Sequence, residues 1–260
     1  MKLNFIKTLA VSLLVGSISQ ISLADLFNLP EKTFLPVEKI FSVEHGFDTT
    51  DTIEIAIQGT MPDSCHTLGK GTVRVDEVNK KIHVNVEGYV RKNQVCWMTV
   101  TPYLEVIHVG QLKKGHYEIV AEKDPLVMGK LHIAKSASNE TDDHLYAPVD
   151  TVELSAKQSE ASLAPFQELN LKGTYPHLLK GCMRVVDVKS YKTENDVLVV
   201  LPISKILDGK DCDPSEVDGS NRFNLKKKVS SIINTKGLVH VRTLNGRAVN
   251  KFVDFSFGQD

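Results

Sequence analysis

Cysteine, histidine and clustered acidic side chains are the groups in this chain that could bind a metal ion or act as nucleophiles. Seven of the nine histidines precede residue 145: His45, His66, His83, His108, His116, His132 and His144. No His-x-x-x-His pair and no Cys-x-x-Cys occurs, so ligands would have to converge from separate strands. We therefore expect surface histidines that are solvated or hydrogen-bonded, and neither a metal ion nor a cofactor.

One acidic run has enough oxygen for calcium. It contains the five carboxylates Asp208, Asp211, Asp213, Glu216 and Asp218. Counted from Asp211, the run lacks the glycine at the sixth position and the bidentate glutamate at the twelfth that define an EF-hand. A solvated loop is our expectation, and a calcium site is the weaker alternative.

The chain carries no recognisable catalytic group. There is no Gly-x-Ser-x-Gly sequence, and neither Ser204 nor Ser230 has an identifiable partner. The formal net charge is -1, with one Trp and 7% aromatic residues, which leaves little to attract a phosphate backbone or to stack on bases. These features predict a protein without enzymatic activity that does not bind nucleic acid.

The four cysteines belong to an internal repeat. Gly59-Thr60-Met61-Pro62 precedes Cys65, and Gly173-Thr174-Tyr175-Pro176 precedes Cys182, about 115 residues later. Cys96 and Cys212 follow at nearly equal separations of 31 and 30 residues. The repeat predicts two disulfides, Cys65–Cys96 and Cys182–Cys212, one in each unit.

The first 24 residues have the order of a secretory signal peptide. Lys2 and Lys7 precede an apolar run, and Ser22-Leu23-Ala24 supplies the small residues of a cleavage site. The run is too short to span a bilayer, and no later stretch is long enough. We expect cleavage after Ala24, no membrane insertion afterwards, and a periplasmic or secreted protein whose cysteines are oxidised.

Short strands fill the rest of the chain. Runs rich in Val, Ile, Thr and Tyr alternate with turn residues, and Asn245-Gly246 marks a tight hairpin. The first unit should contain strands over 37–43, 52–58, 72–78, 81–87, 97–109, 116–121 and 126–133. The second should contain strands over 149–154, 167–171, 183–189, 196–201, 223–233, 238–243 and 247–255.

Seven antiparallel strands per unit are typical of a sandwich, so we predict an all-β chain of two tandem antiparallel β-sandwich domains. The expected division is a signal peptide (1–24), a first domain (25–135), a polar linker (136–146) and a second domain (147–260). Gly115-His116-Tyr117-Glu118-Ile119 resembles the penultimate strand of immunoglobulin-like or fibronectin-type modules. The chain is similar to exported tandem-domain proteins of Gram-negative bacteria, which implies the fold but no activity.

Two groups of residues are candidate binding sites. Met61, Asp63 and His66 surround the first disulfide, and Lys226, Lys227 and Lys228 form a basic run in a strand, where edge protection is the alternative role. The leading hypothesis is a non-enzymatic exported protein that holds a protein or glycan partner with its loops or sheet edges. The alternatives are a proteinase inhibitor that uses loop 61–68, and a structural component of the envelope.

Overall fold

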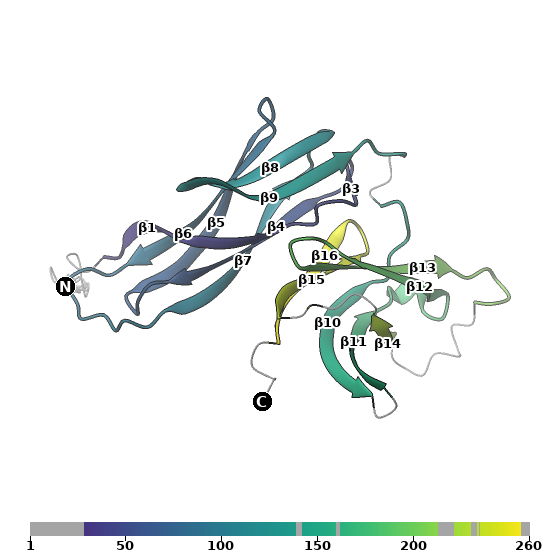
Figure 1. The fold of residues 1–260 in the computed structure, drawn as a ribbon. Helices are drawn as coiled ribbons and strands as arrows, with labels where there is room; N and C mark the ends of the chain where they lie inside the picture. The colour runs from purple at the N-terminus through teal and green to yellow at the C-terminus, as the bar shows by residue number, and fades with distance from the viewer. Residues whose placement is uncertain are drawn as a thin grey trace, which may run out of the picture.

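The computed structural model describes residues 29–138, 142–159, 162–212, 221–229, 233 and 235–255 (Figure 1). Apart from one short 3-10 turn, every regular element in these residues is a β-strand, so the all-β prediction is confirmed. No helix in these ranges is long and apolar enough to cross a membrane. The expected signal peptide, residues 1–24, lies outside the described residues.

The first half of the chain forms two sheets. Its strands are β1 (Glu31–Leu35), β2 (Val37–Phe41), β3 (Phe47–Asp48), β4 (Ile53–Met61), β5 (His66–Asp76), β6 (Lys81–Val90), β7 (Thr101–Gly110), β8 (Gly115–Ala121) and β9 (Asp124–Ala134). One sheet has the order β2-β4-β7. The other has the order β1-β6-β8-β9-β3, and β5 also pairs with β6.

The second half also forms two sheets. Its strands are β10 (Val149–Ser159), β11 (Ser162–Thr174), β12 (Met183–Lys192), β13 (Val197–Ile206), β14 (Arg222–Val229), β15 (Lys236–Thr243) and β16 (Arg247–Asp254), with the 3-10 turn η1 (His177–Leu179) between β11 and β12. The sheet orders are β10-β11-β14 and β12-β13-β15-β16. Each of the expected strands overlaps an observed one, while β1 and β3 were not expected.

Strand direction departs from the prediction at three pairings: the short β3 is parallel to β9, and two further parallel pairs are equivalent in the two halves. We expected antiparallel strands throughout, and this is wrong where β6 pairs in parallel with β8 and β13 pairs in parallel with β15. A parallel pair needs a crossover connection. Here β7 and β14, which lie in the other sheet of their half, carry the chain away and back, so β8 and β15 begin at the same end as β6 and β13.

The core of the first half lies between its two sheets. Ile82 and Val84 in β6 are fully buried, and they share one cluster with Ile55 and Ile57 of β4, in the facing sheet. Buried residues alternate with partly exposed ones along β6, which is the pattern of a strand with one face on a core. The arrangement is that of a β-sandwich.

The repeated glycines have the same structural role in both halves. Gly59 pairs with Tyr103, and a Cβ added to Gly59 would lie 2.0 Å from the carbonyl oxygen of Pro36. Gly173 pairs with Phe223, and its added Cβ would lie 2.0 Å from the carbonyl oxygen of Pro148. In each half, therefore, an aromatic ring from one neighbouring strand and a carbonyl from the residue that precedes the other neighbouring strand occupy the space that a side chain would need.

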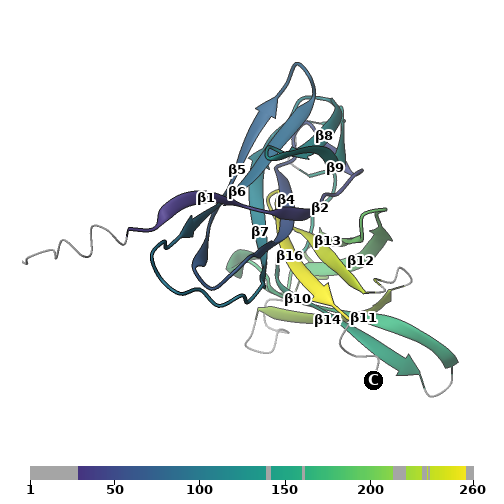
Figure 2. The ribbon, with the colours of Figure 1, turned by 60° about the vertical axis from the view of Figure 1, so that its left-hand side comes forward.

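The two halves pack against each other (Figures 1 and 2). Strands β1–β9 and β10–β16 pair only within their own half among the described residues. Their side chains nevertheless share a core, because Val197, Val199 and Leu238 are buried in the cluster that contains Ile40 and Ile55. The Tyr191 hydroxyl also donates to the His45 carbonyl at 2.8 Å, so polar contacts join the halves as well.

Part of the expected linker is packed. Tyr146 and Ala147 are buried, and the backbone amide of Ala147 donates to the Pro202 carbonyl. Asp142 accepts a hydrogen bond from Arg242 of β15. The part of the polar stretch from residue 142 onward is therefore bound to the second half.

Candidate functional site: an apolar loop anchored by a disulfide

The loop from Arg91 to Val100 connects the two sheets of the first half at one end of the sandwich. β6 ends at Val90 and β7 begins at Thr101, and the residues between them form no strand. We expected a strand from residue 97. That boundary is wrong for residues 97–100, because the backbone of Trp97 hydrogen-bonds to Ser64 rather than to a neighbouring strand.

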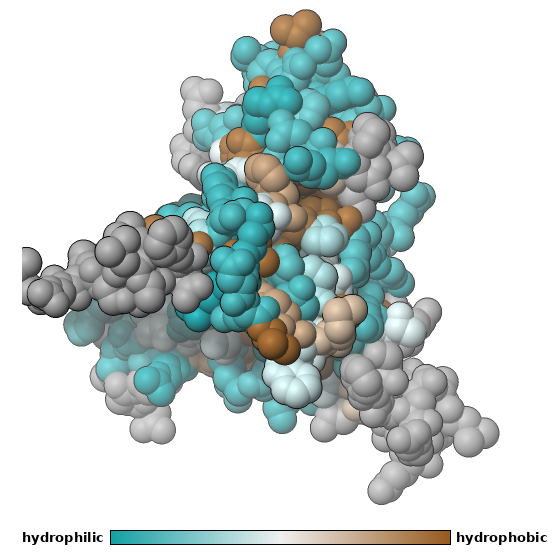
Figure 3. Space-filling view, turned by 90° about the vertical axis from the view of Figure 1, so that its left-hand side faces the viewer, coloured by the Kyte–Doolittle hydropathy of each residue, from teal (hydrophilic) through white to brown (hydrophobic). Residues whose placement is uncertain are grey.

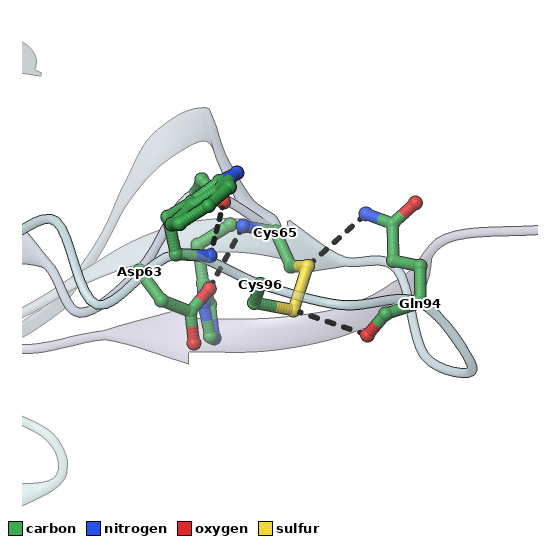
Figure 4. Close-up of a disulfide and its surroundings, with 7 residues drawn as sticks. Asp63, Cys65, Gln94 and Cys96 are labelled. Atoms are coloured by element: carbon green, nitrogen blue, oxygen red, sulfur yellow. Dashed lines mark hydrogen bonds and ion pairs between the residues drawn. A yellow bond between two sulfur atoms is a disulfide. The ribbon is translucent and has the colours of Figure 1, made fainter.

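Both predicted disulfides are present, and Cys65–Cys96 fixes this loop to the turn between β4 and β5 (Figure 4). The two Cα atoms are 5.4 Å apart and Cys65 is buried. The Ser64 amide donates to the Trp97 carbonyl at 3.1 Å, and the Trp97 amide donates to Ser64 Oγ at 2.9 Å. Gln94 Nε2 lies 3.1 Å from Cys65 Sγ. The loop is therefore held at both sides of the disulfide.

Asp63 and His66, both candidate binding residues, hold the turn beneath the disulfide. Asp63 Oδ1 accepts from the Cys65 amide at 2.8 Å and lies 2.7 Å from His66 Nδ1 (Figure 4). The hydrogen bond with His66, assisted by the one from Cys65, lowers the pKa of Asp63 although burial opposes this. Met61 is partly buried against the core. Asp63 and His66 therefore stabilise the turn that carries Cys65, and Met61 packs on the core.

Four large apolar side chains project from the loop into solvent. Their exposed fractions are 90% for Val95, 75% for Trp97, 91% for Met98 and 62% for Val100. In the space-filling view from the left of Figure 1, brown hydrophobic side chains interrupt a mostly hydrophilic face (Figure 3). A single exposed apolar residue is ordinary, but four within six residues make this loop the candidate interaction site.

Sequence reasoning missed these four residues. The run rich in Val, Ile, Thr and Tyr that follows Cys96 suggested a strand, in which these side chains would pack on a sheet. The available signal was position: the apolar run starts beside a predicted disulfide cysteine, where the chain is fixed to a turn instead of to a sheet.

Asp63, Cys65 and Cys96 lie close enough together to resemble a metal site. The two sulfur atoms are bonded to each other in the disulfide, so neither is a free thiolate that could bind a metal ion.

The basic run lies on an edge strand, as the edge-protection alternative requires. β14 is the last strand of its sheet, and Lys226 and Lys228 are exposed on it. Lys227 points to the other face, where its ammonium donates to the Val188 carbonyl. Lys228 lies 4.2 Å from the centre of the Phe166 ring. The three lysines therefore do not form one continuous basic patch.

Only part of the acidic run can be placed. Asp208 and Asp211 form a turn in which the Asp211 amide donates to the Asp208 carbonyl at 2.8 Å. Asp213, Glu216 and Asp218 lie outside the described residues. The calcium alternative therefore remains a prediction.

Comparison with known proteins gives one partial match. Residues 55–125 match the family model of the ORF11 beta-sandwich domain. This region runs from β4 to the start of β9, and it includes both the Cys65–Cys96 disulfide and the apolar loop. The match supports a β-sandwich module in the first half. No curated protein and no solved structure matches the chain.

Proposed function

We propose that this chain is a non-enzymatic exported binding protein, and that its partner is a protein held by the apolar loop of residues 95–100. The observation that carries this proposal is the exposure of Val95, Trp97, Met98 and Val100 on a backbone already fixed by a disulfide. Full burial of such side chains releases about 1.5–3 kcal/mol each. Prior ordering of the loop lowers the entropic cost of docking.

The chemistry of the loop favours a protein over a glycan. Sugars are held by aromatic platforms together with polar side chains that bond their hydroxyl groups, whereas Val95, Met98 and Val100 offer aliphatic or thioether surface only. Trp and Met are enriched in the buried centres of protein interfaces, and Trp is prominent among residues whose truncation costs most. A partner with an apolar pocket matches this loop.

Export and the domain division belong to the same proposal. Two disulfides are compatible with an oxidising compartment. Equivalent strand pairings and equivalent glycine environments in both halves support two tandem immunoglobulin-like modules, at 25–135 and 147–260. Such modules present loops at their ends, which is where the apolar loop lies.

The proteinase-inhibitor alternative has less support. β4 extends to Met61 and β5 begins at His66, so only the tight turn of residues 62–65 remains of the expected inhibitory loop. An extended, projecting backbone is what a proteinase cleft would need. The turn is instead hydrogen-bonded to the apolar loop, through Ser64 and the backbone of Trp97.

Site-directed photocrosslinking in cells that express the chain natively tests the proposal. A photoreactive amino acid would replace Met98, and in a control variant Leu178, which is 93% exposed on the other half. We expect a discrete protein adduct from position 98 that is absent from position 178. Trp97→Ala should weaken its formation, because truncation of a central interface Trp typically costs about 2 kcal/mol or more.

Three outcomes would contradict the proposal. Equal adducts from positions 98 and 178 would mean that exposure alone drives the reaction. Adducts with lipid or glycan only would replace the protein partner with another class. Absence of any adduct from position 98, with the chain correctly oxidised, would leave the loop without a binding role and favour a structural component.

A further inference from the structure

β14 is an edge strand of the second half, and one of its two edges has no neighbouring strand. It pairs with β11 along its whole length, Arg222–Val229, and is the last strand of its three-stranded sheet (Figure 1). Within the described ranges no strand pairs with its other edge. The N–H and C=O groups that point outward from such an edge are free to pair with another chain.

The backbone of β14 carries none of the usual obstacles to strand pairing. Natural edge strands are commonly protected by a proline or by a β-bulge. β14 contains no proline, and its register with β11 runs over residues 222–229 without a shift. The edge strands β2, β10 and β12 each have a register shift instead. The backbone of β14 is therefore regular enough to accept a further strand.

Basic side chains follow this edge and have no acidic partner. Arg222, Lys226 and Lys228 are exposed on the outer face of the sheet, and none of them forms an ion pair with a described residue. Lys227 lies on the inner face, where its ammonium donates to the Val188 carbonyl. β14 itself contains no Asp or Glu. Edge lysines repel a basic strand and oppose an apolar one, whereas an acidic strand would form ion pairs with them.

The inner face of β14 offers apolar contact. Phe223 and Leu225 are partly buried and pack against the core of the second half. Side chains of an added strand would alternate between the same two faces of the sheet. Those on the inner face would extend the apolar layer, and those on the outer face would lie beside the basic side chains. The strand that fits this edge therefore alternates acidic with apolar residues.

We propose that β14 binds an extended segment of a protein partner in which acidic residues alternate with apolar ones, and that this segment adds a strand to the sheet. Main-chain hydrogen bonds would supply affinity, and carboxylates beside Arg222, Lys226 and Lys228 would supply specificity. The charges that oppose pairing between copies of this chain would thus select the partner. This edge lies in the second half, so the proposal does not rest on the apolar loop.

Fluorescence anisotropy of a labelled peptide of alternating Glu and Val, as long as β14, tests the proposal with the oxidised full chain. We expect saturable binding that weakens as salt is added, and no binding of a peptide with Lys in place of Glu. Lys226→Glu should weaken binding about tenfold, because it turns an attraction into a repulsion. Lys205→Glu is the matched control and should leave binding unchanged, since Lys205 is exposed on β13, in the other sheet.

Backbone methylation of the peptide separates strand addition from charge attraction alone. Alternate residues of a strand point their N–H groups to the same side, so methylating the nitrogens of either the Glu or the Val residues should abolish binding, while methylating the other set should not. Hydrogen exchange in Arg222–Val229 should slow when the unmodified peptide binds.

Four results would overturn the proposal. They are absence of peptide binding, equal binding by the Lys226 and Lys205 variants, equal binding of the two methylated peptides, and unchanged hydrogen exchange in β14 at saturation.

Discussion

At the residue scale, Arg242 joins the two halves of the molecule. Its side chain is 6% exposed and pairs with Asp51 of the first half and, at 2.7 Å, with Asp142. The guanidinium also lies over the rings of Phe47 and Tyr146. Burial alone would lower the pKa of Arg242, but the hydrogen bonds and charges of the two carboxylates outweigh it and raise the pKa. Arg242 is therefore a permanent charge in the interior.

Replacing Arg242 should cost far more stability than replacing a surface partner. Arg242→Met would leave the Asp51 carboxylate buried without its cation, and such losses cost about 3–5 kcal/mol. Lys39→Met is the matched control, since Lys39 also bridges the halves, to Asp196, but in an exposed pair worth about 0–1 kcal/mol. Urea unfolding of both variants gives the two values. Equal losses would contradict a structural role for the buried pair.

His240 should make stability depend on pH. Complete burial, with help from the charge of Arg242, lowers the pKa of His240 to about 4, although a hydrogen bond with Asn250 opposes this shift. Between about pH 6.5 and 4 the unfolded chain therefore binds a proton that the folded chain does not. The stability that His240 contributes is fully present above about pH 6.5. It is lost as the pH is lowered toward 4, by up to about 1.4 kcal/mol per pH unit.

His240→Gln removes that contribution and keeps a polar side chain near Asn250. Unfolding free energies at about pH 7 and about pH 5 should differ less in this variant than in the native chain. His177→Gln, at an exposed site in η1, should behave like the native chain. If the His240 variant loses as much stability on acidification as the native chain, His240 is not the responsible group.

At the element scale, the repeated glycines set how closely the start of β2 approaches β4 and the start of β10 approaches β11. Gly59→Ala or Gly173→Ala would place a methyl group against a carbonyl oxygen and an aromatic ring. Overpacking of this kind costs about 1–3 kcal/mol or more. Gly209→Ala is the control, because nothing lies within 4 Å of its added Cβ. Thermal unfolding compares the three variants, and equal melting temperatures would remove this explanation of the repeat.

The strands themselves could be predicted from the sequence, because alternation is a local property. Ile82, Val84 and Val86 showed which face of β6 is buried, and Asn245-Gly246 has the positive φ values of a tight hairpin. The parallel pairing of β6 with β8 could not be predicted, since it depends on which sheet receives β7. The apolar loop was missed for a similar reason: contacts distant in sequence, such as those between Ser64 and Trp97, determine which side chains are exposed.

At the scale of the whole molecule, the shared core changes what separation of the halves would cost. If the polar linker of residues 136–146 lay outside both cores, cutting it would release two folded fragments. Separation would expose Val197, Val199 and Leu238 to water and break the Arg242–Asp51 pair. A chain cut at a protease site engineered between Ser136 and Asp142 should therefore remain one species in gel filtration. Two separately eluting fragments would show that the interface is weak.

The central claim, that the apolar loop binds a protein, can be measured at a single residue, because Trp97 is the one Trp of the chain. Incorporation of 5-fluorotryptophan gives a single ¹⁹F resonance from the middle of the loop. Addition of the protein identified by crosslinking from position 98 should shift this resonance to a buried environment in the native chain, and the Leu178→Ala control should behave identically. A resonance that stays at its solvent-exposed position when the partner is saturating would contradict the claim.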